Sequence, residues 1–131
     1  DYQGGDVMEK MKAIHERTLV ICMIETRAGL ENVEAIAAVD GVDVLWLGHF
    51  DLTNFLGIPG QFSHPAYRDA VKRIAGAAAR HRKSAGYMAA SAELGREYLG
   101  HGYRMIATGT DQGLLQQATA QLISFWKNPS A

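Results

Sequence analysis

The chain has one cysteine, three prolines and a net charge of only −1 over 131 residues. A single cysteine excludes a disulfide within the chain. Because Cys22 lies in an apolar run, we predict a packing role in a reducing compartment, the cytoplasm. No apolar run approaches the roughly 18 residues of a membrane helix, so no membrane span is expected. The near-zero charge, with acids and bases interspersed, gives no sign of nucleic-acid binding.

Length and composition describe an ordinary globular protein. With 47% hydrophobic and 21% charged residues, we expect one domain over residues 1–131 with a substantial core. The chain opens Asp1-Tyr2-Gln3-Gly4-Gly5 without an initiator methionine. We therefore expect that it was processed or forms part of a longer protein.

Hydrophobic periodicity predicts four short strands that alternate with helices. The strands are expected at residues 19–25, 42–47, 86–90 and 103–108. Helices are expected at residues 6–17, 29–39, 63–83, 91–101 and 110–127, with one helical turn at 52–56 and a loop at 57–62. Strands and helices that alternate in this way indicate a parallel α/β architecture.

Several positions have specific structural predictions. Ser63 is the expected N-cap of the third helix, with Pro65 in its first turn. Its inward stripe is predicted to be Tyr67, Val71, Ile74 and Ala78, and that of the helix capped by Ser91 to be Leu94, Tyr98 and Leu99. Trp46 is assigned to the core. The last helix has an apolar stripe wider than one sheet face requires, which predicts a surface covered by a partner: Leu114, Leu115, Ala118, Leu122, Ile123, Phe125 and Trp126.

A carboxylate stands at the end of each of the first two apolar runs: Glu25 ends the strand predicted at 19–25, and Asp51 follows four residues after the strand predicted at 42–47. A crossover helix between parallel strands brings their ends to the same sheet edge, where α/β folds keep their chemistry. Two carboxylates there suit a divalent metal that prefers oxygen, while the cysteine and histidines form no zinc motif. The residues alone leave alternatives open: Glu25 as a solvated strand end or salt-bridge partner, and Asp51 as the N-cap of the turn at 52–56.

The order and spacing of four motifs resemble the HpcH/HpaI aldolase family, metal-dependent (class II) pyruvate aldolases built on a (β/α)8 TIM barrel. The motifs are Ile24-Glu25-Thr26-Arg27, Gly41-Val42-Asp43 leading to Leu47-Gly48-His49-Phe50-Asp51-Leu52, His64-Pro65, and Thr108-Gly109-Thr110-Asp111. The resemblance runs from about residue 19 to 125. It implies the second half of the barrel, strands five to eight, with residues 1–18 as the helix before strand five.

The resemblance also implies a function. The family cleaves or forms 4-hydroxy-2-oxo acids, giving pyruvate and an aldehyde through a metal-stabilised pyruvate enolate. Glu25 and Asp51 match its metal-binding carboxylates, for Mg²⁺, Mn²⁺ or Co²⁺. Backbone amides around Phe50 and Asp51 match those that hold the pyruvate carboxylate, so the implied substrate-binding residues are Gly48, His49, Phe50 and Asp51. The family's last helix is often exchanged between subunits, which implies a homo-oligomer with residues 110–127 swapped.

This sequence departs from the family pattern in two ways. His49 and Phe50 stand where the family has proline and a small residue, which predicts a bulkier pocket floor. The base histidine, its acidic partner and an arginine that polarises the keto oxygen match no position here. They are expected in the barrel's first half, so we expect the isolated chain to be inactive.

Within this chain, His49 is the candidate base, with packing or pocket lining as the alternative. For Arg27, a contact with the substrate and an ion pair with a neighbouring acid both remain open. Asp111 is predicted to cap the last helix, with residues 108–110 lining the mouth of the site. The other histidines are expected on the surface: His15, His64, His81 and His101.

Two rival functions remain open at this stage. One is a citrate-lyase-like enzyme that acts on an acyl-CoA thioester, for which a basic patch would be expected and none stands out in the sequence. The other is a non-catalytic half-barrel, whose exposed strand edges and apolar last helix serve assembly with a second chain.

Overall fold

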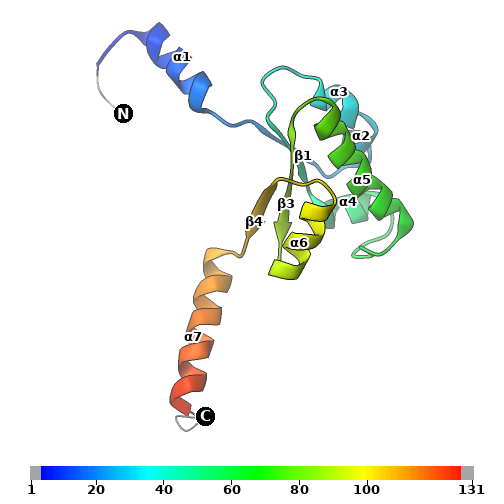
Figure 1. The fold of residues 1–131 in the computed structure, drawn as a ribbon, viewed down its shortest axis with the longest axis vertical. Helices are drawn as coiled ribbons and strands as arrows, with labels where there is room; N and C mark the ends of the chain where they lie inside the picture. Colours follow the sequence, from blue (N-terminus) through cyan, green and yellow to red (C-terminus); the bar gives the residue numbers. More distant parts are fainter. Residues whose placement is uncertain (1–3, 128–131) are drawn as a thin grey trace.

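The computed structural model describes residues 4–127 and confirms the parallel α/β prediction (Figure 1). Four strands form one parallel sheet in the order β1-β2-β3-β4. They are β1 (Ile21–Ile24), β2 (Val44–Leu47), β3 (Ser84–Ala89) and β4 (Met105–Thr108). Each strand pairs with the next along the chain, so all carboxyl ends share one edge of the sheet.

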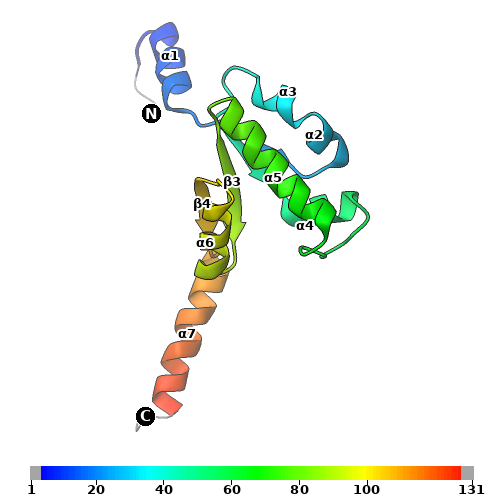
Figure 2. The ribbon, with the colours of Figure 1, turned by 45° about the vertical axis from the view of Figure 1, so that its right-hand side comes forward.

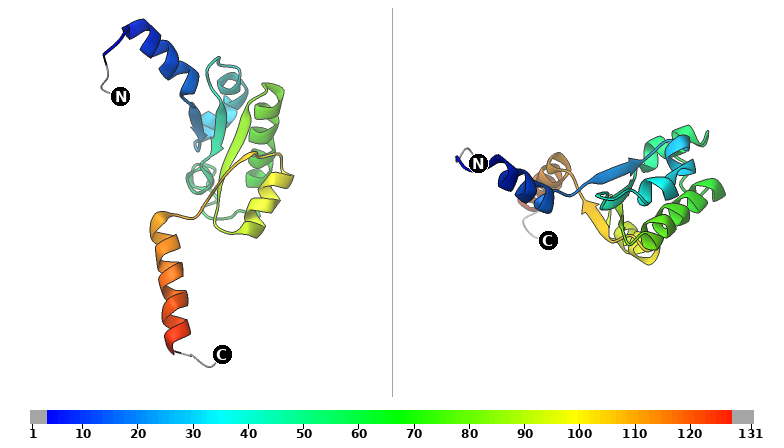
Figure 3. Two further views of the ribbon diagram at one scale, coloured as in Figure 1. Left: turned by 60° about the vertical axis from the view of Figure 1, so that its left-hand side comes forward. Right: turned by 90° about the horizontal axis from the view of Figure 1, so that it is seen from above.

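Five helices cover one face of this sheet: α2 (Arg27–Glu31), α3 (Val33–Ala37), α4 (His49–Phe55), α5 (Pro65–Arg80) and α6 (Ala92–Gly100). The described residues also form α1 (Val7–Arg17) and α7 (Asp111–Lys127). Helix α5 runs along the covered face with α2 and α3 beside it (Figure 2). The terminal helices α1 and α7 project away from the sheet and bury none of their residues (Figure 3). Between residues 4 and 127, no helix combines the length and apolar character that crossing a bilayer requires.

The helix predicted at residues 29–39 is two short helices, separated at Asn32. This residue has φ −98° and ψ 12°, and its Nδ2 donates to the carbonyl oxygen of Ala28 at 2.9 Å. An asparagine side chain that bonds the local backbone competes with a regular helix. The prediction of one continuous helix was therefore wrong.

His64, not Ser63, caps α5. Its backbone is extended (φ −63°, ψ 138°), and its Nδ1 accepts a hydrogen bond from the N–H of Ala66 at 3.1 Å. Pro65 occupies the first turn, as predicted. Because a proline disfavours helical backbone in the residue before it, the non-helical cap falls at His64.

The core lies between the sheet and helices α2 to α6. The predicted stripe of α5 is confirmed, since all four of its members are buried: Tyr67, Val71, Ile74 and Ala78. In α6, Tyr98 is buried and Leu94 packs against the core, but Leu99 is 45% exposed. Leu99 follows Tyr98 by one residue and so points about 100° away around the helix. The inward prediction for Leu99 was wrong.

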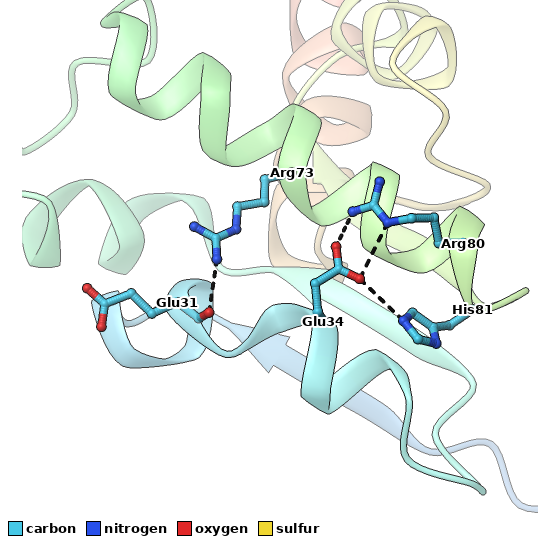
Figure 4. A network of polar contacts seen from close by, with 5 residues as sticks. All are labelled: Glu31, Glu34, Arg73, Arg80 and His81. Carbon is cyan, nitrogen blue, oxygen red and sulfur yellow. Dashed lines mark hydrogen bonds and ion pairs between the residues drawn. The ribbon is translucent and has the colours of Figure 1, made fainter.

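An exposed polar cluster joins α3 to the end of α5 (Figure 4). The carboxylate of Glu34 accepts hydrogen bonds from Arg80, and its Oε2 lies 3.2 Å from Nε2 of His81. The hydrogen bond from Arg80 is the main cause that lowers the pKa of Glu34. Arg73 donates to the backbone oxygen of Glu31 at 2.9 Å. Because these groups are solvated, we interpret them as positioning contacts of small net energy.

The second face of the sheet is uncovered. Strand register places Met23, Trp46, Gly86 and Met105 in one row on this face. Met23 is 55% exposed, and Trp46 is only partly buried, so its core assignment was wrong. A β-carbon on Gly86 would lie 2.4 Å from Cε3 of Trp46. The glycine therefore lets the indole ring lie across β3.

Candidate functional site

Glu25 lies beside the end of β2, at the carboxyl edge of the sheet. The N–H of Gly48 donates to the carbonyl oxygen of Ile24 at 3.1 Å, which extends the pairing of β1 and β2 by one residue. A β-carbon on Gly48 would fall 2.5 Å from Cβ of Glu25, 3.0 Å from its Oε2 and 3.2 Å from Cγ of Met23. The Glu25 side chain thus lies over Gly48 on the uncovered face, in a space that only a glycine leaves free.

Asp51 lies three residues beyond Gly48, in the first turn of α4. The N-cap of that helix is Gly48, so the alternative of Asp51 as N-cap was wrong. Asp51 is exposed and Glu25 is partly buried. Within residues 4–127, neither carboxylate has a hydrogen bond or an ion pair. The salt-bridge alternative for Glu25 was therefore wrong as well, among these residues.

Arg27 forms no ion pair with a described acid. Its Nη2 donates instead to the backbone oxygen of Phe55 at 3.1 Å. This contact ties the start of α2 to the end of α4. The guanidinium therefore supports the segment that carries Asp51.

The two carboxylates fit a partial site for a hard divalent metal. Among the described residues, no group of three or more His, Cys, Asp or Glu side chains could hold a metal. Mg²⁺ and Mn²⁺ are commonly bound by one or two carboxylates, with water and substrate oxygens completing the shell. Glu25 and Asp51 match that pattern, and nothing in this donor set favours zinc.

The imidazole of His49 packs on the helix-covered side of the sheet. Its ring centroid lies 4.6 Å from that of Phe50, 5.0 Å from Tyr87 and 5.7 Å from Phe62. Burial lowers the pKa of His49, and the charge of Asp51 opposes this effect in part. The ring therefore lines a cavity behind the sheet, while Glu25 lies on the opposite face. Pocket lining, the alternative left open by the sequence, agrees with this placement.

That cavity has a volume of about 690 Å³ and lies between α5 and α6. Phe50, itself 62% exposed, packs edge-on against Phe62 with ring centroids 5.3 Å apart at the cavity mouth. The bulky side chains of His49 and Phe50 thus line this cavity. The remaining lining comes from the following loop, α5, β3 and α6: Phe62, Ser63, Tyr67, Arg68, Val71, Lys72, Tyr87, Met88, Ala90, Leu94, Glu97, Tyr98 and His101.

A cluster of four tyrosines, of which Tyr67, Tyr87 and Tyr98 line the cavity, was not predicted as a functional feature. Tyr87 and Tyr98 stack in parallel with centroids 3.5 Å apart. The hydroxyl of Tyr103 donates to the carbonyl oxygen of Val71 at 3.1 Å. The sequence does contain one signal of this cluster, since four of its five tyrosines fall between residues 67 and 103.

The predicted cap of α7 needs a correction. Oγ1 of Thr110 accepts from the N–H of Gly113 at 3.1 Å, which is the capping contact. Asp111 is the first helical residue, and its Oδ1 accepts from the N–H of Gln112 at 2.8 Å. Asp111 therefore assists the first turn, but Thr110 provides the cap.

The other histidines divide into two groups. His15 and His101 are exposed, as predicted, although His101 lies at one wall of the cavity. His64 and His81 are partly buried, one as the α5 cap and the other beside Glu34. Both still reach the surface, as predicted, and each has a local hydrogen-bond partner.

Comparison with known proteins places this arrangement in a family. Residues 6–118 match the model of the HpcH/HpaI aldolase/citrate lyase family. The chain belongs to this family. Among its relatives, the hydroxypyruvate/pyruvate aldolase of Chromohalobacter salexigens is 36% identical over 123 residues, which cover 94% of this chain and 48% of that protein. The 5-keto-4-deoxy-D-glucarate aldolase of Klebsiella pneumoniae is 35% identical with the same coverage.

The fold agrees with this membership. The HpcH/HpaI aldolase of Desulfitobacterium hafniense superposes with a TM-score of 0.80 at 28% identity, covering 97% of this chain and 49% of that one. The predicted TIM-barrel fold is confirmed, with the chain spanning about half the length of the HpcH/HpaI relatives it matches. The four-stranded sheet is thus one half of a barrel wall, and its uncovered face is the face that lines a barrel's interior.

Proposed function

We propose that this chain provides the metal-binding side of a carbon–carbon lyase active site. The proposed reaction is the metal-dependent cleavage or formation of 4-hydroxy-2-oxo acids, with pyruvate and an aldehyde as the products of cleavage. The main observation behind it is that the Glu25 side chain lies over Gly48, at the same carboxyl edge of the sheet as Asp51. Membership of a family of aldolases and lyases supports it.

In this proposal the residues of the edge bind the metal and the substrate carboxylate. Glu25 and Asp51 hold the cation, which when bound acts as a Lewis acid toward the keto oxygen of the substrate. The first intrahelical bond of α4 runs from the N–H of Leu52 to the oxygen of Gly48. The amides of Phe50 and Asp51 precede it, where a helix leaves its first N–H groups without intrahelical partners, and in this proposal they hold the pyruvate carboxylate.

The proton transfers require groups other than the Glu25 and Asp51 carboxylates and the two amides. Aldol cleavage needs a base for the 4-hydroxyl proton. His49 remains the weak candidate within the chain, although its ring lies on the face opposite Glu25. We expect the base and the keto-polarising arginine in a barrel half that complements this one. The chain alone is therefore expected to bind the metal without turning over substrate.

The acyl-CoA rival gains no support from the basic cleft at the amino edge of the sheet. Lys83 and Arg104 border a cleft of about 470 Å³, but each comes directly before a strand, at the amino edge of the sheet. Phosphates held there would lie across the sheet from Glu25. The non-catalytic alternative and the aldolase proposal both involve the uncovered sheet face. Enzymatic activity of a barrel that contains both halves would distinguish between them.

The test is Mn²⁺ binding to the purified chain, followed by electron paramagnetic resonance. Glu25→Gln and Asp51→Asn should each weaken Mn²⁺ binding by roughly tenfold or more, since even supporting partners of metal ligands contribute 10–100-fold. Asp69→Asn, an exposed acid on α5, is the matched control and should leave binding unchanged. Undiminished Mn²⁺ affinity in either site variant would make the ligand assignment wrong.

The second step measures activity in a protein that contains both barrel halves. Pyruvate release from a 4-hydroxy-2-oxo acid should require Mn²⁺ or Mg²⁺ and be lost in Glu25→Gln. Metal-dependent cleavage of an acyl-CoA substrate without pyruvate release would favour the rival instead.

A further inference from the structure

The cavity between α5 and α6 is separate from the proposed metal edge. Its walls come from α4, the following loop, α5, β3 and α6, so it lies in the helix layer behind the sheet. Glu25 lies on the other face, beside Gly48 and Met23. At about 690 Å³ the cavity falls in the size range of small-molecule sites, roughly 300–1,000 Å³.

The inner part of the cavity is aromatic and geometrically ordered. Phe62 packs edge-on to Tyr67 with centroids 5.4 Å apart, and Tyr87 is stacked on Tyr98. His49 contacts both Phe62 and Tyr87. A planar group that enters this space meets ring edges and faces on several sides, the arrangement that aromatic pairs prefer.

Two cations stand at one side of the cavity without partners. Arg68 and Lys72 are one turn apart on α5, and both side chains are exposed. Within the part of the chain that the structure describes, neither side chain has a hydrogen bond, ion pair or ring contact. On the facing helix α6, Oε1 of Glu97 lies 3.7 Å from Nε2 of His101. When protonated, this histidine offsets the negative charge of Glu97.

The hydroxyl groups of the wall are neutral donors. Burial raises the pKa of Tyr67 and Tyr98 far above the usual range of tyrosine. The hydroxyl oxygens lie 2.7 Å apart, so one hydroxyl donates to the other. The cavity thus combines an aromatic interior with neutral hydroxyl groups and positive charge, and the one carboxylate in its lining lies beside His101.

We propose that this cavity binds a small planar carboxylate of one or two aromatic rings. The ring system lies among Phe62, His49 and Tyr87, and the carboxylate lies against Arg68 and Lys72. No metal takes part, and neither Glu25 nor Asp51 is in the cavity lining. Binding of this carboxylate therefore does not require the proposed metal ligands.

The test uses 2-naphthoate as the probe, titrated into the metal-free chain and followed by nuclear magnetic resonance. The ring signals of Phe62, Tyr87 and Tyr98 should shift with saturation. Uncharged 2-naphthamide has the same shape, so it measures the aromatic contribution alone. The double variant Arg68→Gln/Lys72→Gln should weaken naphthoate about tenfold, on the scale of charge-assisted contacts, and leave naphthamide unchanged.

One control variant and two blocking variants keep the test specific. Lys12→Gln/Arg96→Gln removes the same charge from exposed helix positions outside the cavity lining and should not change either affinity. Leu94→Trp fills the cavity and should abolish binding of both probes, and Ala90→Trp does so from an exposed position at its border.

Three results would overturn the proposal. One is equal naphthoate affinity in the charge-removal variant and the unaltered chain. Another is binding that survives both tryptophan variants. The third is probe-induced shifts confined to Ile21, Met23 and Trp46, which would place the probe on the uncovered sheet face. Because no metal or pyruvate is present, none of these results depends on the lyase proposal.

Discussion

The hydroxyl oxygens of Tyr67 and Tyr98 lie 2.7 Å apart in the buried layer between α5 and α6. This is the direct polar link between the two longest helices of the covered face. Tyr98→Phe removes one partner and leaves the hydroxyl of Tyr67 unpaired. We expect a loss of about 1–2 kcal/mol in the free energy of unfolding, measured by urea denaturation.

The double variant isolates the bond itself. Tyr67→Phe/Tyr98→Phe removes both hydroxyls and should cost less than the sum of the two single changes, with a coupling of about 1 kcal/mol. Strictly additive losses would mean that the pair makes no net contribution to stability.

Gly48→Ala is expected to disturb Glu25. The added β-carbon would fall 2.5 Å from Cβ of Glu25, closer than atoms approach without displacement. Overpacking of this kind costs about 1–3 kcal/mol. Moving the carboxylate should also weaken Mn²⁺ binding, measured by electron paramagnetic resonance.

Gly100→Ala is the matched control, because a β-carbon there would meet no atom within 4 Å. It should leave Mn²⁺ binding unchanged. Gly48→Ala with unaltered Mn²⁺ affinity would argue against a role for Glu25 in metal binding.

His49 should make the stability of the chain depend on pH. Burial lowers its pKa below the reference value of 6.5, so the unfolded chain binds this proton more readily than the folded chain. The contribution of neutral His49 is complete above about pH 6.5 and is lost as pH falls toward the folded-state pKa. Urea denaturation between pH 8 and 5 should show this decline.

His49→Gln removes the titrating group and should flatten that part of the profile. A nuclear magnetic resonance titration of the His49 ring checks the same shift directly. A midpoint at or above 6.5 would contradict the predicted direction.

Helix α7 is expected to pack on another copy of the chain, in line with the proposed homo-oligomer. Leu115 and Trp126 are 70% and 73% exposed, and apolar surface of this size is typical of interaction sites. Leu122→Glu/Trp126→Glu should reduce the mass measured by light scattering toward the 14.3 kDa of one chain.

The control Gln116→Glu/Gln117→Glu adds the same charge at polar positions of α7. It should leave the assembly intact. An unchanged mass in the Leu122 and Trp126 variant would place any interface elsewhere.

The sequence identified the order of strands and helices, because the first strands are short continuous apolar runs and the helices repeat apolar positions at helical spacing. Local competition was harder to predict. Asn32 divides one predicted helix by bonding Ala28, and Pro65 moves the cap to His64. Both effects depend on backbone contacts of single side chains, which periodicity does not describe.

The candidate site shows a similar division. Placement of Glu25 and Asp51 at one edge follows from the parallel crossover, which sequence spacing predicts. The direction of the His49 ring does not, because it depends on Tyr87 and Phe62, which approach from other elements. Leu99 and Trp46 were misplaced for the same reason: hydrophobicity alone does not say which face of an element has a partner.

The sheet order β1-β2-β3-β4 has a consequence for how the chain reaches its structure. Every strand pairs with its sequence neighbour, and the covering helices lie between the strands they join. The paired residues nevertheless lie 19 to 40 positions apart in the sequence. Each crossover must close before its two strands can pair, and the entropy lost in that closure slows the folding of parallel sheets. We therefore expect assembly of the sheet, and not formation of the single helices, to limit the folding rate of this chain.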